Sequence, residues 1–169
     1  MASFRFTLFL SLVTLLGMCA RTDALCPPDW EPDQVPGTTY CYRIFNPTVA
    51  KTWLQAESYC DESHTADLVS IHSLSEAIKV YDIFQSENPG RDDRMWIGLN
   101  KPVGAVDYEW SDGSTRHYTR WTNEPPQGSA PSAVVLIPPG NGADSSKWEV
   151  STATEQGYLM CKKPAQNTP

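Results

Sequence analysis

The chain has 169 residues, of which 40% are hydrophobic and 20% charged, and its formal net charge is −7 at pH 7. This length suits a single domain able to bury one proper core. The acidic balance argues against nucleic acid and anionic membrane surfaces as general partners, so we do not expect nucleic-acid binding. Membrane insertion is not expected either, because no stretch after about residue 24 is apolar enough to span a membrane.

Residues 1–24 have the layout of a secretory signal peptide. A basic residue precedes an apolar run over about residues 6–16, and small residues follow. The run is too short to span a hydrocarbon core of about 30 Å, which disfavours the alternative of a membrane anchor. Cleavage after Ala24 fits slightly better than cleavage after Ala20. We therefore expect a secreted, extracellular protein with one domain over residues 25–169.

Residues 26–45 predict a hairpin-like unit at the start of that domain. Proline and glycine mark its turns, and "TTYCYRIF" has the alternation of a strand. The segment "TVAKTWLQAESYCDES", residues 48–63, predicts an amphipathic helix. Four of its apolar or small residues fall on one face: Val49, Trp53, Ala56 and Cys60.

Two further elements are expected before residue 95. The segment "ADLVSIHS", residues 66–73, predicts a strand. The segment "SLSEAIKVYDIFQSE", residues 73–87, predicts a second helix whose first residues resemble a capping box. The following "NPGRDDR" ends this helix, because proline and glycine interrupt it.

From Met95 onward the sequence consists of short β-prone runs separated by clusters of Gly, Pro, Asn and Asp. These runs are "MWIGLN", "YEWSD", "SAVVLI", "KWEV" and "GYLMCKK". Two of the connecting loops are long, over residues 118–131 and 138–146. Helices followed by an antiparallel β region predict an α+β domain. Long loops on such a scaffold are where we expect binding.

Of the five cysteines, one lies in the expected leader. The remaining Cys26, Cys41, Cys60 and Cys161 are an even number in an oxidising compartment, which predicts two disulfides. Their spacing alone allows more than one pairing. Zinc binding is the competing interpretation, but the chain lacks the C-x-x-C and H-x₃-H spacings that would support it.

The sequence does not indicate an enzyme. It contains neither G-x-S-x-G nor H-E-x-x-H. His64, His72 and His117 have no partner at the spacing of a metal site or a catalytic triad. We therefore expect a binding protein without catalysis.

Seven segments together resemble the C-type lectin-like domain family. They are "WLQAESYC", "ADLVSIHS", "MWIGLN", "YEWSDGS", "WTNEPPQG", "KWEV" and "YLMC", in the family's order and spacing. The resemblance extends from Cys26 to Lys163, and the length is similar to that of the small secreted members. It implies the C-type lectin-like fold, with two helices, antiparallel sheets and a long-loop region.

The resemblance also implies how the cysteines pair. It implies Cys60–Cys161 for the core of the domain and Cys26–Cys41 for the N-terminal hairpin of the long form. A third disulfide that is usual in the family would fall on Ala133 and Ala153, so both of its partners are absent. We expect the long-loop region to be looser as a result.

In sugar-binding members of the family, calcium is held by an acid and an amide in a Glu-Pro-Asn type of triplet, by a later acid and by a Trp-Asn-Asp triplet. Here the first triplet is Glu124, Pro125 and Pro126, and the second has Trp148 and Glu149 followed by valine. Proline and valine supply no side-chain oxygen to calcium, which takes six to eight. Glu124 and Glu149 are thus the candidate metal ligands, and they predict at most weak calcium binding, at roughly 10⁻⁴–10⁻³ M.

We expect no cofactor, and weak calcium binding is the alternative left open. Glu124 is also interpreted as a solvated loop acid or a partner of Arg120, and the resemblance implies a cis bond between Glu124 and Pro125. Trp121 and Trp148 are expected in the core rather than as platforms for a sugar.

The candidate ligand-binding residues are accordingly Glu124, Pro125, Pro126, Trp148 and Glu149. The expected function is recognition of a glycan or another surface ligand through the long-loop face, with calcium dependence weak or absent. The alternatives are a calcium-independent module that binds protein or mineral, and a calcium-dependent lectin with an unusual ligand set.

Overall fold

The computed structural model of the chain describes most of the expected domain. The described residues are 24–35, 37–46, 48, 52–87, 93–123, 125, 132–136, 146–151 and 156–167. The helices and strands, in chain order, are β1 (Ala24–Leu25), β2 (Glu31–Val35), β3 (Thr38–Phe45), α1 (Trp53–His64), β4 (Asp67–Leu68), α2 (Leu74–Glu87), β5 (Met95–Lys101), β6 (Glu109–Trp110), β7 (Ser132–Leu136), β8 (Trp148–Ser151), β9 (Tyr158–Pro164) and β10 (Gln166–Asn167).

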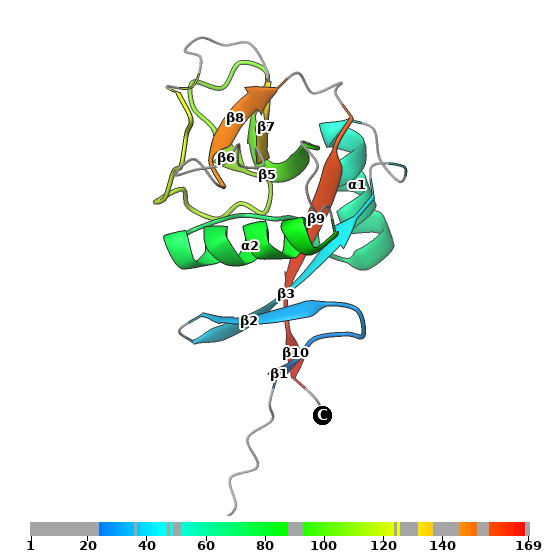
Figure 1. Cartoon of the computed structure of the whole chain (residues 1–169). Helices are drawn as coiled ribbons and strands as arrows, with labels where there is room; N and C mark the ends of the chain where they lie inside the picture. Colours follow the sequence, from blue (N-terminus) through cyan, green and yellow to red (C-terminus); the bar gives the residue numbers. More distant parts are fainter. Residues whose placement is uncertain are drawn as a thin grey trace, which may run out of the picture.

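One 8-stranded sheet holds the domain together, with the order β2-β3-β9-β5-β7-β8; β4 pairs with β9, and β6 pairs with β5. The two helices and the strands confirm the predicted α+β class. In Figure 1, α2 lies between the β2–β3 hairpin below it and the region of β6, β7 and β8 above it. A separate pair, β1 with β10, brings Ala24 opposite Asn167.

The sheet contains one parallel pair in addition to the antiparallel pairing that was expected. β5 runs parallel to β9, with Met95 opposite Tyr158 and Trp96 opposite Leu159. Parallel neighbours need a long connection that returns the chain to the same end of the sheet. Here the chain between β5 and β9 provides it, and β7 and β8 lie on this connection.

Helix α1 begins at Trp53 because Thr52 caps it. The Thr52 hydroxyl accepts a hydrogen bond from the Gln55 N–H at 3.2 Å, and the Gln55 side chain accepts one from the Thr52 N–H at 3.2 Å. This reciprocal capping box satisfies two donors at the start of the helix. Ala56 and Cys60 are buried, as their common face predicts, whereas Val49 lies outside the described residues.

Helix α2 has only half of the capping box expected from "SLSE". The Ser73 hydroxyl accepts from the Glu76 N–H at 3.1 Å, as in such a box. The Glu76 carboxylate, however, does not bond back to Ser73. It accepts from the His72 N–H at 2.7 Å and from the Tyr42 hydroxyl at 2.7 Å. Burial diverts this carboxylate from the cap to the core.

The segment expected to be a strand over residues 66–73 pairs over only Asp67–Leu68. Beyond Leu68 its backbone bridges two strands rather than following one. The Val69 N–H donates to the Met160 carbonyl at 2.8 Å, and the Val69 carbonyl accepts from the Gly98 N–H at 2.9 Å. A Cβ at position 98 would lie 2.7 Å from the Leu68 carbonyl oxygen, so only glycine fits this crossing.

Both disulfides that the resemblance implied are present. Cys26 is bonded to Cys41, and Cys60 to Cys161, each with a Cα–Cα distance of 5.5 Å. The second links α1 to β9 across 101 residues of sequence. Cys41, Cys60 and Cys161 belong to one core cluster, and Cys26 packs against it. A second and larger core cluster lies beside α2.

A buried ion pair joins α2 to β9. The Lys162 ammonium lies 2.6 Å from the Glu76 carboxylate, and both side chains are nearly inaccessible. The ammonium also donates to the carbonyl and hydroxyl oxygens of Ser70, at 3.0 and 3.2 Å. Burial, together with the Glu76 charge, raises the pKa of the Tyr42 hydroxyl, so Tyr42 remains a neutral donor to Glu76. The pair is stable in the core because each charge has several partners.

Candidate long-loop site

The described part of the long-loop face is held together by backbone hydrogen bonds to β8. The Thr122 N–H donates to the Trp148 carbonyl at 2.9 Å, and the Trp148 N–H donates to the Arg120 carbonyl at 2.7 Å. Trp121 thereby forms a parallel bridge with Trp148. The first residues of "WTNEPPQG" therefore lie directly beside "WEV".

Aromatic packing supports this contact from below. The Trp148 side chain is fully buried, and its ring meets those of Trp110, Tyr118 and Trp121 edge-on at 5.5, 5.8 and 5.7 Å. Trp121 is half-buried, and its ring lies 5.1 Å from that of Tyr108. The Trp148 side chain is structural and is not available to stack on a ligand, whereas Trp121 keeps some accessible surface.

A pocket of about 200 Å³ lies over this cluster. Of the five predicted ligand-binding residues, the structure brings Pro125, Trp148 and Glu149 to this pocket, while Glu124 and Pro126 lie outside the described residues. The expected Glu124–Arg120 pairing and the cis bond after Glu124 fall there too.

Thr122 and Asn123 also line the pocket, and both are exposed. The comparison with the calcium ligands of the family missed them because the first ligand triplet begins at Glu124. Their position immediately before that residue, in "WTNEPPQG", is the signal that could have identified them.

The described donors do not fit a calcium ion. Of the described residues lining the pocket, only Glu149 carries a carboxylate, and Val150 beside it has no side-chain oxygen. The Trp148 carbonyl already accepts from Thr122. Within the part of the chain that the structure describes, no three His, Cys, Asp or Glu side chains gather as a metal site. Calcium needs six to eight oxygens, far more than this set supplies.

The three histidines occupy unrelated places. The His64 ring stacks on Phe45 at 4.6 Å, in the cluster near the disulfides. His117 is exposed. His72 Nε2 lies 3.1 Å from the hydroxyl oxygens of both Ser70 and Ser114.

The contacts of His72 do not form a catalytic triad. The Ser114 hydroxyl donates to Asp112, so the acid is bonded to the serine instead of orienting the histidine. Burial and the nearby Lys162 charge lower the pKa of His72. Burial alone would raise the pKa of Asp112, but hydrogen bonds from Ser114 and Ser70 hold it below its ordinary value. The arrangement thus keeps a neutral ring beside an ionised acid.

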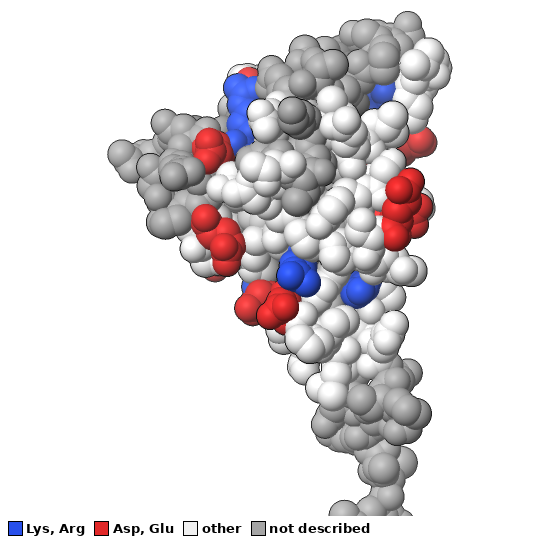
Figure 2. Space-filling view, turned by 90° about the vertical axis from the view of Figure 1, so that its right-hand side faces the viewer, with Lys and Arg blue, Asp and Glu red and all other residues white. Residues whose placement is uncertain are grey.

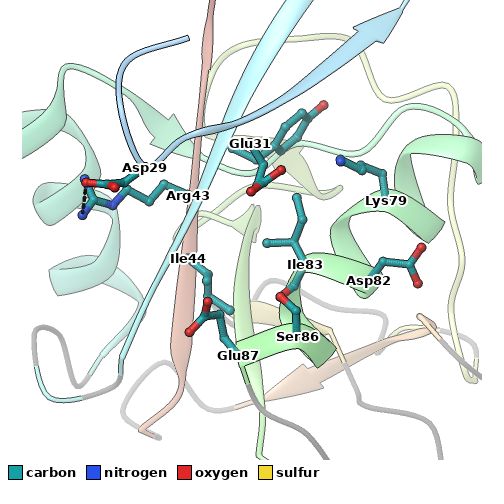
Figure 3. A pocket seen from close by; sticks show the side chains of 10 residues that line it. Asp29, Glu31, Arg43, Ile44, Lys79, Asp82, Ile83, Ser86 and Glu87 are labelled. Atoms are coloured by element: carbon teal, nitrogen blue, oxygen red, sulfur yellow. Dashed lines mark hydrogen bonds and ion pairs between the residues drawn. The ribbon is translucent and has the colours of Figure 1, made fainter.

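A second and larger hollow, of about 560 Å³, lies between the β2–β3 hairpin and α2 (Figure 3). Sequence reasoning gave no indication of it, because its two walls come from segments at least 35 residues apart. Its lining residues are Asp29, Glu31, Tyr42, Arg43, Ile44, Lys79, Asp82, Ile83, Ser86 and Glu87.

The face of the domain in Figure 2 carries its charges in separate groups. Figure 2 shows acidic side chains scattered in small clusters over one face, with a few basic side chains and no continuous patch of either sign. Among the described residues, no helix has both the length and the apolar character needed to cross a membrane.

The chain is similar in sequence and in structure to several known proteins. The profile of the family "Lectin C-type domain" matches residues 49–163. The chain is 30% identical to snaclec 5 of Echis pyramidum leakeyi, over 98% of this chain and 100% of that protein. It is 31% identical to lymphocyte antigen 75 of Homo sapiens over 90% of this chain, but spans only 8% of that protein's length. Human lithostathine has a similar structure, with a TM-score of 0.68 at 25% identity, over 82% of this chain and 99% of that one.

Proposed function

The chain belongs to the C-type lectin domain family, whose members are non-enzymatic binding proteins, and we propose that it is a secreted recognition protein of this kind. It binds a glycan or another surface-displayed ligand through the long-loop face. Its binding does not depend on a well-formed calcium site. The proposed secretion rests on the leader-like residues 1–24 and on the two disulfides, which form and persist in oxidising compartments.

The pocket beside β8 carries this proposal. An exposed amide, hydroxyl and carboxylate, from Asn123, Thr122 and Glu149, surround an aromatic floor that includes half-buried Trp121. Such a set can donate to and accept from sugar hydroxyls, while the ring packs on the apolar face of the sugar. Glu149 and Val150 stand where the calcium-binding relatives have Asn and Asp, which supports recognition by direct hydrogen bonds.

A glycan array, probed with and without a calcium chelator, tests the proposal. We expect the same glycans to bind in both conditions. Asn123→Ala and Glu149→Gln should each weaken binding, whereas Glu109→Gln, a matched change of an exposed acid on β6, should not. Glu124→Gln tests the remaining acid of the first triplet in the same assay. Binding that disappears with the chelator would identify a calcium-dependent lectin instead.

A calcium titration provides a separate check on the metal. We expect no rise in melting temperature at about 10 mM Ca²⁺, ten times the weak end of the range for extracellular sites. An array without any bound glycan in either condition would favour the alternative, a calcium-independent module that binds protein or mineral.

A further inference from the structure

The hollow between the hairpin and α2 is separate from the long-loop site. In Figure 1 the hairpin lies below α2, whereas β8 and the long-loop region lie above it. The two walls come from β2 and β3 on one side and from α2 on the other. Its volume of about 560 Å³ is within the range of ligand clefts, about 300–1,000 Å³.

The floor of this hollow is apolar. The Tyr42 side chain is fully buried, Ile83 is 7% exposed, and Ile44 is half-buried. In Figure 3 the side chains of Ile44 and Ile83 lie between the strand and the helix, with Glu31 above Ile83 and Glu87 beside Ile44. A ligand can therefore bury an aliphatic segment here.

The rim has an excess of negative charge. Glu31 from β2 and Asp82 and Glu87 from α2 line the hollow, with Lys79 as one opposing charge. Arg43 does not compensate these carboxylates, because its guanidinium lies 3.8 Å from the Asp29 carboxylate, on the side away from Ile83 (Figure 3). No ion pair among the described residues neutralises Glu31, Asp82 or Glu87.

We propose that this hollow binds an arginine or lysine side chain of a partner protein. The methylene stem would lie on Ile44 and Ile83, and the charged head would reach the carboxylates of the rim. Long basic side chains combine an apolar stem with a charged end in this way. Hydrogen bonds between a basic head group and carboxylates are stronger than those between neutral groups.

An exposed apolar ledge beside the hollow favours a protein segment over a free amine. Leu74 and Ile78, on the solvent side of α2, are 50% and 49% exposed. They are four residues apart, and Asp82 of the rim follows Ile78 by the same interval, so the three side chains are neighbours along one face. An extended segment can place its basic residue in the hollow and an apolar neighbour on this ledge.

To test this, the full domain is titrated with a capped peptide, acetyl-Gly-Leu-Gly-Arg-Gly-amide. The amide shifts of the protein are measured by NMR at low ionic strength. The control peptide replaces arginine with citrulline, which has the same shape without the charge. We expect amide shifts confined to β2, β3 and α2, and binding of the citrulline peptide weakened about tenfold, the effect of losing about 1.4 kcal/mol. Added salt should weaken the arginine peptide more than the citrulline one, because salt screens exposed charges.

The variant Glu31→Gln with Glu87→Gln should weaken the arginine peptide about tenfold, as citrulline does, because it removes the same charge-assisted contacts from the protein side. Both side chains are exposed, so the fold should tolerate the change. Glu109→Gln is the matched control and should bind as the unmodified protein does. Three results would overturn the proposal: no shifts at about 10 mM peptide, ten times a millimolar Kd; equal binding of the citrulline peptide; or binding unaffected by the double variant. Binding of ethylammonium as tight as that of the peptide would instead assign the site to small cations.

Discussion

The two halves of the sheet are held together by different forces. The half with α1, β3 and β9 contains both disulfides and the buried Glu76–Lys162 pair. The half with β7, β8 and the segment around Trp121 has a strand ladder and the aromatic packing of Trp121 on Trp148, and no disulfide among its described residues. Ala133, where the family resemblance implies a half-cystine, lies in β7 of this second half. The disulfides and the buried ion pair are thus concentrated away from the face that we propose for recognition.

Removing the disulfides should affect stability most. Replacing Cys60 and Cys161 by alanine should lower the free energy of unfolding by about 4.7 kcal/mol, because this bond closes a loop of about 100 residues. The same change at Cys26 and Cys41 should cost about 3 kcal/mol, because the loop is short. Urea denaturation of the two variants measures both. Equal losses would contradict an explanation based on loop length.

The buried ion pair should come next. Lys162→Met leaves the Glu76 carboxylate buried without its cation and should cost about 3–5 kcal/mol. Adding Glu76→Gln removes the remaining charge and keeps an acceptor for Tyr42, so the double variant should recover much of the loss. A double variant less stable than the single one would show that Glu76 stabilises the domain mainly through its bonds to Tyr42 and His72.

Adjacent residues of β8 should differ sharply. Trp148→Ala opens a cavity under the long-loop face and should cost about 3–5 kcal/mol. Glu149→Ala changes an exposed side chain and should alter stability by no more than about 0.5 kcal/mol. Thermal unfolding of both variants tests this contrast. A large effect of Glu149→Ala would place Glu149 in the structure rather than in recognition.

A smaller effect is expected for the dependence of stability on pH through His72. Since burial and Lys162 lower the pKa of His72 below 6.5, the unfolded chain binds a proton there before the folded chain does. The contribution of His72 to the free energy of unfolding should therefore be fully present above about pH 6.5 and decrease as the pH falls below this value. Denaturation at several pH values should show a gentler slope near pH 6 for His72→Gln. The exposed His117→Gln serves as the control, and an equal change in both variants would contradict this assignment.

Local patterns predicted the elements that form through local contacts. The hairpin strand β3 and the helix after Thr52 follow from alternation and capping, and the pairing of the cysteines followed from the family resemblance. The failures have non-local causes. The Glu76 carboxylate, expected to cap α2, is bonded to Tyr42 and Lys162 instead. The segment after Leu68 is hydrogen-bonded to two strands that are distant in sequence.

The candidate site shows the same division. The bridge between Trp121 and Trp148 brings the first residues of "WTNEPPQG" beside "WEV". The motif comparison had only placed Glu124 and Glu149 in one candidate site, and Glu124 lies outside the described residues. It did not identify Asn123 and Thr122, because the ligands of a metal site differ from the residues that line the remaining pocket. The hollow beside α2 has no sequence motif, since Ile44 of β3 and Ile83 of α2 line the same space only in the folded chain.

The position of β9 has a consequence for biosynthesis. This strand, Tyr158–Pro164, is paired with β3, β4 and β5, and it carries both Cys161 and Lys162. While the chain is being synthesised, β3, β4 and β5 lack β9 as their partner, and Cys60 and Glu76 lack Cys161 and Lys162, until almost the whole domain has been made. We therefore expect the domain to fold only after its last long strand has been synthesised. Its apolar segments then need protection from aggregation during synthesis, because contacts between distant residues form slowly.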